Sequence, residues 1–225
     1  MSEKRLLLIN GSPRRGGTSY SFARTLKKLT ENVGNTAEII HIIDYYDEKE
    51  SFEELESKLQ QSDIIAVVTP LYVDTLTYPN IWFFERLSDE YKTQLKGKRF
   101  FAIAQSGFLD IKLSEPLLNS CKFFAEETGM KWLGGLAHGG GAIINGEKVE
   151  NLGRKGKKIS MAFKLALENI LQDKMVPSRS QELLTIKISK IFYPLLAAFM
   201  NHMTKRNLRK HNISFEEFTK KVYLD

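Results

Sequence analysis

The chain reads Leu6-Leu7-Leu8-Ile9-Asn10-Gly11-Ser12-Pro13-Arg14-Arg15-Gly16-Gly17-Thr18-Ser19 near its start, and this segment limits the architectures available to the rest. Its uninterrupted apolar run is typical of a strand buried on both faces of a parallel sheet. A turn of Gly, Pro and hydroxyl residues follows, and a helical pattern begins near Tyr20. A buried strand that turns directly into a helix creates an anion site, because unpaired N–H groups and the helix dipole meet there. The segment therefore predicts a site for a phosphate monoester.

Backbone N–H groups, three hydroxyls and one guanidinium are the candidate phosphate donors of this turn. They belong to Ser12, Arg14, Gly17, Thr18 and Ser19. A P-loop requires Lys-[ST] where Gly17-Thr18 stands, and a dinucleotide fingerprint requires a glycine where Pro13 stands. Both nucleotide motifs are therefore excluded, and a plain capped turn without a ligand is the remaining alternative.

Composition indicates an ordinary globular protein, since 42% of the 225 residues are hydrophobic and 27% are charged. The single cysteine, Cys121, excludes an internal disulfide framework and a cysteine metal cluster, and its apolar neighbours predict a buried thiol. We predict no metal site. Because the first residues carry no apolar core behind positive charges, we expect no signal peptide and a cytoplasmic location.

Four further apolar runs predict strands, at residues 37–43, 63–69, 98–104 and 131–136. Each strand alternates with a segment of helical periodicity, which predicts one parallel sheet covered by helices on both faces. Right-handed crossovers favour an α/β, flavodoxin-like three-layer sandwich with a five-stranded sheet in the order 2-1-3-4-5. We assign this domain to residues 1–172 and a basic, apolar helical extension to residues 173–225.

Two more loops follow central strands at the edge of the sheet where such folds bind ligands. The first contains Pro70, Leu71, Tyr72, Val73, Asp74 and Thr75, and the second contains Gln105, Ser106 and Gly107. Tyr72 offers an aromatic wall, and the N–H groups of residues 73–75 can face the edge of a flat ring. The three loops together predict a site for a phosphorylated ligand with a planar ring.

These motifs resemble those of the NADPH-dependent FMN reductases with a flavodoxin-like fold. Gly11-Ser12-Pro13-Arg14 resembles their FMN-phosphate loop, and the segment 70–76 resembles the loop that they place against the isoalloxazine ring. Trp82-Phe83-Phe84-Glu85-Arg86 resembles the helix that follows, and residues 139–146 resemble a glycine segment found after strand five in one branch. The resemblance covers roughly residues 4–172. Thr18 stands where the family usually has Asn.

The resemblance implies bound FMN, reduction by NADPH or NADH, and transfer to a small-molecule electron acceptor such as a quinone, flavin, nitro or azo compound. It also implies a homodimer and assigns the ring contacts to the 70–75 loop. Hydride transfer between stacked rings depends on positioning, so we predict no catalytic residue. No cysteine cluster follows Tyr72, which excludes the iron–sulfur variants. A flavodoxin-type electron carrier, or a flavin-free protein that docks through its basic tail, remains as an alternative function.

The net charge of +6 comes from the C-terminal part of the chain. Residues 1–152 contain 18 Lys and Arg against 21 Asp and Glu, whereas residues 153–225 contain 15 against 6. The apolar run 191–200 is shorter than the roughly 20 residues of a transmembrane helix. The basic residues around it are Lys187, Lys190, Lys205, Arg206, Arg209 and Lys210.

This pattern predicts an amphipathic basic helix that packs on the domain, covers a subunit interface or lies on an anionic membrane; we favour the first two. Nucleic-acid binding is not expected, because no recognised DNA- or RNA-binding motif accompanies the basic residues. Ser214 and Glu217 predict a capping box at the start of a short last helix.

Overall fold

The computed structural model describes residues 3–186, 191 and 193–220. Its contacts divide the chain into two units, Met1–Thr185 and Ile186–Asp225, which are described separately. The division falls thirteen residues beyond position 172, because the segment after α8 (Gly153–Leu171) still packs on the first unit.

The first unit contains one parallel sheet of five strands in the order β2-β1-β3-β4-β5, which confirms the predicted fold. The strands are β1 (Arg5–Asn10), β2 (Thr36–His41), β3 (Ile64–Pro70), β4 (Arg99–Gln105) and β5 (Lys131–His138). The strand order reverses between β1 and β3, which pair in register from Leu6 with Ile64 to Asn10 with Val68. The carboxyl ends of these two strands therefore meet at the position where open α/β sheets bind ligands.

Side chains of β1 alternate between two separate cores, as the pleat of a strand requires. Leu6 and Leu8 belong to the core on one face of the sheet, and Leu7 and Ile9 belong to the core on the other. All four are at most 2% exposed. Burial on both faces explains why the sequence shows a continuous apolar run and no alternation.

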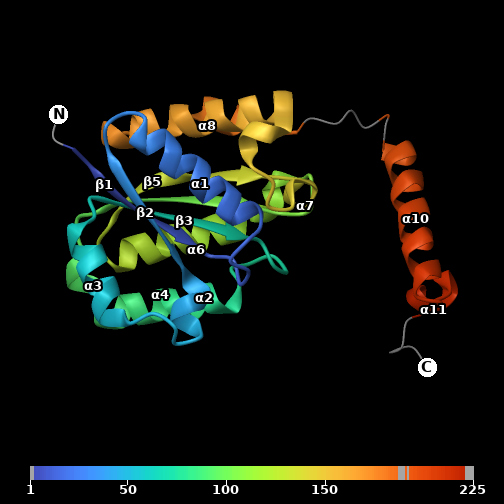
Figure 1. Ribbon diagram of the computed structural model, residues 1–225, viewed down its shortest axis with the longest axis horizontal. Coiled ribbons are helices and arrows are strands. Elements are labelled where there is room, and N and C mark those ends of the chain that lie inside the picture. The colour runs from blue at the N-terminus through green and yellow to red at the C-terminus, as the bar shows by residue number, and fades with distance from the viewer. Residues whose placement is uncertain (1–2, 187–190, 192, 221–225) are drawn as a thin grey trace. The chain divides into compact units, whose positions relative to one another are not determined.

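Helices cover both faces of the sheet and complete a three-layer sandwich (Figure 1). One face carries α1 (Thr18–Glu31) and α8, and the other carries α3 (Phe52–Gln61), α4 (Tyr78–Glu90) and α6 (Glu115–Glu127). The short helices are α2 (Ile42–Tyr46), α5 (Lys92–Leu95), α7 (Gly141–Ile144) and α9 (Ser178–Leu184), with 3-10 turns η1 (Ile111–Ser114) and η2 (Val149–Leu152).

Two helices differ from the sequence prediction. The second strand ends at His41, and α2 replaces the predicted strand residues 42–43 because Ile42 and Tyr45, three residues apart, both enter the core. Helix α9 lies in the range 173–225, which the sequence predicts as the C-terminal extension, but it packs on α8 and β5 of the first unit. Its Gln181 side chain accepts from the N–H of Ala137 (2.8 Å) and donates to the carbonyl of the same residue (2.9 Å). This amide pairs with the open edge of β5 and thereby fixes α9 to the sheet.

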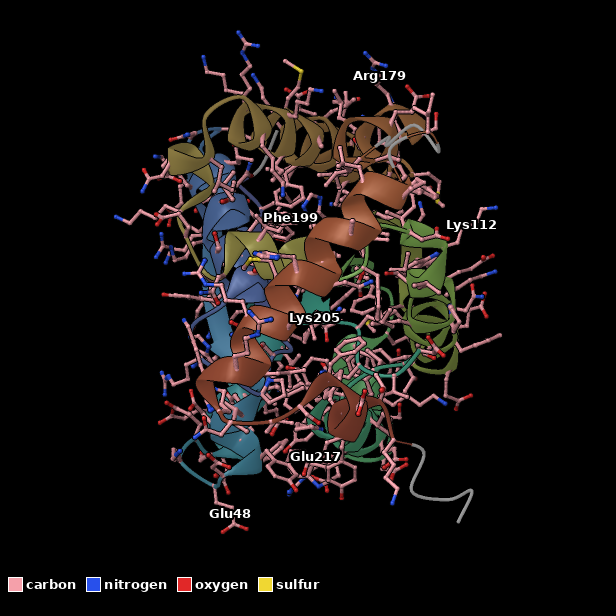
Figure 2. The ribbon with its side chains drawn as sticks, turned by 90° about the vertical axis from the view of Figure 1, so that its right-hand side faces the viewer. Glu48, Lys112, Arg179, Phe199, Lys205 and Glu217 are labelled. Carbon is pink, nitrogen blue, oxygen red and sulfur yellow. The ribbon has the colours of Figure 1, made fainter. Side chains whose placement is uncertain are left out.

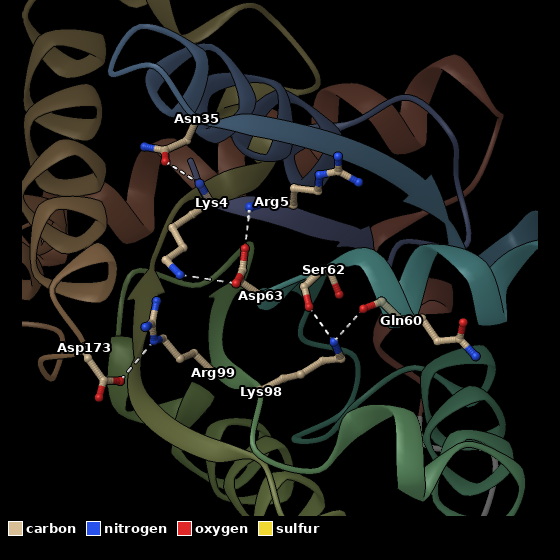
Figure 3. Close-up of polar contacts among 9 residues, drawn as sticks. All are labelled: Lys4, Arg5, Asn35, Gln60, Ser62, Asp63, Lys98, Arg99 and Asp173. Atoms are coloured by element: carbon tan, nitrogen blue, oxygen red, sulfur yellow. Dashed lines mark hydrogen bonds and ion pairs between the residues drawn. The ribbon is translucent and has the colours of Figure 1, made fainter. Parts of the chain in front are cut away.

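Ion pairs and hydrogen bonds join the amino ends of the strands (Figure 3). The carboxylate of Asp63 accepts from the N–H of Arg5 (2.9 Å) and from Nζ of Lys4 (3.3 Å). The guanidinium of Arg99 pairs with Asp173 at 3.1 Å. These contacts connect the starts of β1, β3 and β4 with the segment after α8.

The second unit contains α10 (Tyr193–Lys210) and α11 (Phe215–Thr219). Pro194 lies in the first turn of α10, where a proline is tolerated because its missing N–H is not needed. The hydroxyl of Ser214 accepts from the N–H of Glu217 at 3.0 Å, which is the predicted cap of the last helix. Lys187 and Lys190 lie outside the described residues. Within the described helices, none is long and apolar enough to cross a membrane.

Candidate functional site

Four loops gather at the carboxyl edge of the sheet, after β1, β3, β4 and β5. Every candidate ligand contact predicted from the sequence lies in these loops or at the adjoining end of a strand or helix: Thr18 and Ser19 begin α1, and Pro70 and Gln105 end β3 and β4. Hydrogen bonds connect neighbouring loops: the N–H of Leu71 donates to the carbonyl of Gln105 (2.8 Å), and the N–H of Ser106 donates to the carbonyl of His138 (3.0 Å). The loops therefore form one continuous surface at this edge.

The N-terminus of α1 presents free N–H groups. Helix α1 begins at Thr18, directly after Gly17, whose φ of 145° lies in a region that L side chains rarely adopt. In the described structure, the N–H groups of residues 16–19 donate to no protein acceptor. A Cβ added at Gly16 or Gly17 would meet no atom within 4 Å, although Gly146 lies close to the backbone of Gly17, since a Cβ on Gly146 would be 3.1 Å from the Gly17 nitrogen. This geometry can accept an anion.

Arg14 adds a cation to this site. Its side chain is exposed and forms no ion pair with any described residue, whereas the neighbouring Arg15 is paired with the buried Asp44 at 2.7 Å. The N–H of Arg14 donates to the hydroxyl of Ser12 at 3.2 Å, and this bond shapes the turn from inside. Of the two adjacent arginines, Arg14 is thus the one whose guanidinium is available to a ligand.

The hydroxyls of Thr18 and Ser19, at the start of α1, already form hydrogen bonds within the protein. Thr18 Oγ1 donates to the carbonyl of Gly141 at 2.7 Å, and Ser19 Oγ accepts from Nε2 of Gln105 at 3.3 Å. Thr18 and Ser19 are 5% and 1% exposed. Their backbone N–H groups are therefore the parts that remain free, and their hydroxyls connect α1 to the loops after β4 and β5.

Two asparagines that the sequence analysis did not select support the first loop. Asn10 Nδ2 lies 2.9 Å from Nδ1 of His41, and Asn80 Nδ2 donates to the carbonyl of Gly11 at 2.5 Å. Both asparagines are fully buried. A Cβ on Gly11 would clash with the side-chain oxygen of Asn80 and would lie 2.9 Å from Cβ of Thr69, so this position requires glycine. The sequence could have indicated both asparagines, since each places a polar amide beside apolar positions of a predicted strand or helix.

A tight hairpin turn forms the loop after β3. The N–H of Tyr72 donates to the carbonyl of Thr75 (3.1 Å), and the N–H of Thr75 donates back to Tyr72 (3.2 Å). Between them, Val73 and Asp74 have φ values of 47° and 64°, which define a type I′ turn. A β-branched residue at positive φ is strained, and Val73 is also 95% exposed. Such strain at an exposed turn is frequent at functional sites.

The remaining residues of this loop and the loop after β4 differ in accessibility. Pro70 is buried as the last residue of β3, and Tyr72 is 44% exposed. Ser106 is 2% exposed and donates to the carbonyl of Phe108 at 3.0 Å, so its hydroxyl supports the loop. Gly107 is exposed at the same edge.

His138 ends β5 and is only 2% exposed. Burial and the nearby Lys155 lower the pKa of His138 from 6.5 to about 4, and a bond between Nδ1 and the carbonyl of Leu184 only partly opposes this shift. The other ring nitrogen is buried without a partner among the described residues. His138 is therefore neutral at pH 7. Cys121 is also buried, and desolvation raises the pKa of its thiol, so it is no nucleophile at neutral pH.

Comparisons with known proteins identify a family for the first half of the chain. Residues 4–115 match the family model of the NADPH-dependent FMN reductases. A comparison with curated proteins gives no match. In the part of the chain that the structure describes, no group of three or more His, Cys, Asp or Glu residues could hold a metal ion.

Solved structures share the fold at low sequence identity. A flavone reductase is 14% identical, with a TM-score of 0.58 over 79% of this chain and 70% of its own. An NADH:FMN oxidoreductase in its apo form is 18% identical, with a TM-score of 0.54 over 72% and 89%. An NADPH-quinone reductase from P. pentosaceus is also 18% identical, with a TM-score of 0.52 over 72% and 95%. The family match covers the 11–19 segment and the 70–75 loop, and over residues 4–115 the chain belongs to the NADPH-dependent FMN reductase family.

Proposed function

We propose that the protein binds FMN at the carboxyl edge of its sheet and acts as an NADPH- or NADH-dependent oxidoreductase on a small-molecule acceptor. The family match supports the reaction class, and the free N–H groups at the start of α1 carry the proposal for the cofactor. A phosphate monoester needs several converging donors and an unobstructed approach. Residues 14–19 supply the donors, and a Cβ added at Gly16 or Gly17 would meet no atom within 4 Å.

The donor set fits FMN in two further respects. Arg14 is a free cation beside the anion site, and the 72–75 turn supplies an aromatic side chain and a strained, exposed backbone. In our proposal, Ser12, Arg14, Gly17, Thr18 and Ser19 hold the phosphate, with Thr18 and Ser19 acting through their N–H groups. The 70–75 loop lies against the ring, and Gln105, Ser106 and Gly107 border the ribityl and pyrimidine side.

FMN bound there supplies a ring that takes a hydride from a nicotinamide and delivers electrons to an acceptor. The protein contributes position and electrostatic stabilisation, without a side-chain acid or base. The N–H groups of Val73 and Asp74, which donate to no acceptor in the described structure, would stabilise negative charge on the ring, whereas the N–H of Thr75 is already used within the turn. His138 is neutral, buried and bonded to Leu184, so it has no role as a proton donor in this proposal.

Three acceptor classes fit the proposal, namely quinones, free flavins and nitro or azo compounds. The sequence does not distinguish NADPH from NADH, because the nicotinamide binds only transiently over the ring. The absorbance experiment below therefore compares both nucleotides. The homodimer and the cytoplasmic location stay predictions from the sequence.

Absorbance spectroscopy of the full chain with added FMN tests the function directly. We expect the desalted protein to keep the yellow flavin bands and to bleach anaerobically on addition of NADPH or NADH. Bleached protein should regain its colour when a quinone, free flavin, or nitro or azo compound is added, and the fastest acceptor names the substrate class. A preparation that stays colourless after FMN addition would overturn the proposal. Yellow protein that neither nucleotide bleaches would establish the electron-carrier alternative.

A further inference from the structure

The second unit carries exposed apolar side chains on α10. Leu195, Phe199 and Met203 follow one another at intervals of four residues, which places them on one side of the helix. Their exposures are 69%, 58% and 38%, and Met200 beside them is 57% exposed. Figure 2 shows Phe199 on α10, together with Lys205 further along the helix. Exposure of such an apolar stripe to water is unfavourable in free energy, so we expect a binding partner to bury it.

Cations follow the apolar stripe along the same helix. The last six residues of α10 include Lys205, Arg206, Arg209 and Lys210, and the helix contains no Asp or Glu. None of these four cations forms an ion pair with a described residue. Lys205 instead lies 4.9 Å from the centre of the Phe215 ring.

Helix α11 adds further apolar surface beside these cations. Phe215 and Phe218 are 37% and 58% exposed. The cation–π contact of Lys205 joins the two helices, so aromatic rings and unpaired ammonium groups occur in the same part of the unit. Aromatic rings and cations with long stems are the residue types that occupy the boundary between acyl chains and headgroups.

We infer that the second unit binds the surface of a lipid bilayer with anionic headgroups. The apolar side chains of α10 and α11 enter the boundary with the acyl chains, and the four cations meet the headgroups. Charge favours this occupant over a second copy of the chain. Residues 186–225 contain eight Lys and Arg against three Asp and Glu, whereas residues 1–185 contain 25 against 24, so another copy offers no net attraction.

Sedimentation of the full chain with vesicles tests this inference. We expect binding to vesicles of equal parts phosphatidylserine and phosphatidylcholine, and at least a tenfold weaker affinity for phosphatidylcholine alone. The quadruple variant with Lys205, Arg206, Arg209 and Lys210 changed to Gln should lose about 600-fold in affinity, because each of the four cations near such a surface contributes about a factor of five. Salt at about 1 M, where the screening length is about 3 Å, should release the wild-type protein.

Two further variants test whether the apolar stripe and the position of the cations both matter. Leu195→Gln with Phe199→Gln should weaken vesicle binding at least tenfold, since it removes apolar contact and keeps every charge. The matched control changes Lys112, Arg154, Lys157 and Lys158, four exposed cations of the first unit, to Gln and should bind vesicles like wild type. Helicity by circular dichroism and the midpoint of urea unfolding identify any variant that fails to fold.

Two results would overturn the inference. The first is equal sedimentation of the wild type and the quadruple α10 variant. The second is a protein that ignores anionic vesicles but forms a dimer in light scattering that Phe199→Gln dissociates, because a second copy then covers the stripe. The measurement uses no flavin readout for binding, so its outcome is independent of the proposed enzymatic function.

Discussion

The polar groups at the two ends of the strands differ in how many of them find a hydrogen-bond partner within the protein. At the amino edge, Asp63 is satisfied by Arg5 and Lys4, and Lys98 donates to the carbonyls of Ser62 (2.5 Å) and Gln60 (3.2 Å), as Figure 3 shows. At the carboxyl edge, the N–H groups of residues 16–19 lack protein acceptors, and Val73 is strained. Groups that are paired within the protein stabilise the fold, whereas free donors and strain are retained where a ligand completes them. This contrast supports our proposal that the ligand binds at the carboxyl edge.

The largest expected effect concerns His138, the buried titratable group of the carboxyl edge. Its folded pKa of about 4 lies below the unfolded value of 6.5, so only the unfolded chain takes up a proton between these two values. The free energy of unfolding should therefore fall by about 3 kcal/mol as the pH drops from 6.5 to 4. Urea unfolding at several pH values measures this slope. His138→Phe should flatten it, and an identical slope in that variant would contradict the assignment.

Two arginines, one at each edge, give the next largest effect. Arg14→Ala should weaken FMN binding by about 1.5–3 kcal/mol, because it removes a charge-assisted hydrogen bond to phosphate. Arg5→Ala removes an exposed arginine at the amino edge, whose Nη1 contacts Gln61, and should leave FMN affinity unchanged. Fluorescence titration with FMN measures both. An equal loss of FMN affinity in the two variants would contradict the assignment of FMN binding to the carboxyl edge.

Val73 tests the strain in the 72–75 turn. Val73→Gly should raise the free energy of unfolding by about 1 kcal/mol, because glycine adopts positive φ without a steric penalty. Val33→Gly changes another exposed valine, which has no positive φ, and should not stabilise the protein. Urea unfolding of the two variants without FMN gives the comparison. A Val73→Gly variant less stable than wild type would show that the turn stores no strain.

The smallest effect is expected at Asp63. Burial raises the pKa of this carboxyl, but the N–H of Arg5 and the ammonium of Lys4 outweigh burial and hold the pKa below 3.8. The stability that Asp63 contributes is therefore present above pH 3.8 and is lost as the pH falls through the lower folded value. The partly exposed pair limits it to under about 1 kcal/mol. Asp63→Asn should remove this acid dependence and leave FMN binding intact, whereas a loss of FMN would contradict the separation of the edges.

Much of the fold could be predicted from the sequence because burial on both faces leaves continuous apolar runs such as Leu6–Ile9. Helix α2 could not, since Ile42 and Ile43 extend the apolar run of β2 and only the core contact of Tyr45 distinguishes a helix there. The packing of α9 on the first unit could not be predicted either, because Gln181 bonds to Ala137 of β5, which is distant in sequence.

The candidate site was only partly predictable for the same reason. The free N–H groups follow from the local order of strand, turn and helix, which the 11–19 segment displays. The bond from Thr18 to Gly141 joins residues 123 positions apart, so no local pattern indicates it. Likewise, Asn80 donates to the carbonyl of Gly11 from the first turn of α4, and this contact is visible only in the folded chain.

A single comparison of two ligands tests the central claim, that the N-terminus of α1 holds a phosphate. Isothermal titration of the flavin-free protein with FMN and with riboflavin, which lacks only the phosphate, isolates that contact. We predict that FMN binds at least about 100-fold more tightly than riboflavin, since several N–H groups and Arg14 contact only the phosphate. Equal affinities for the two flavins would contradict it.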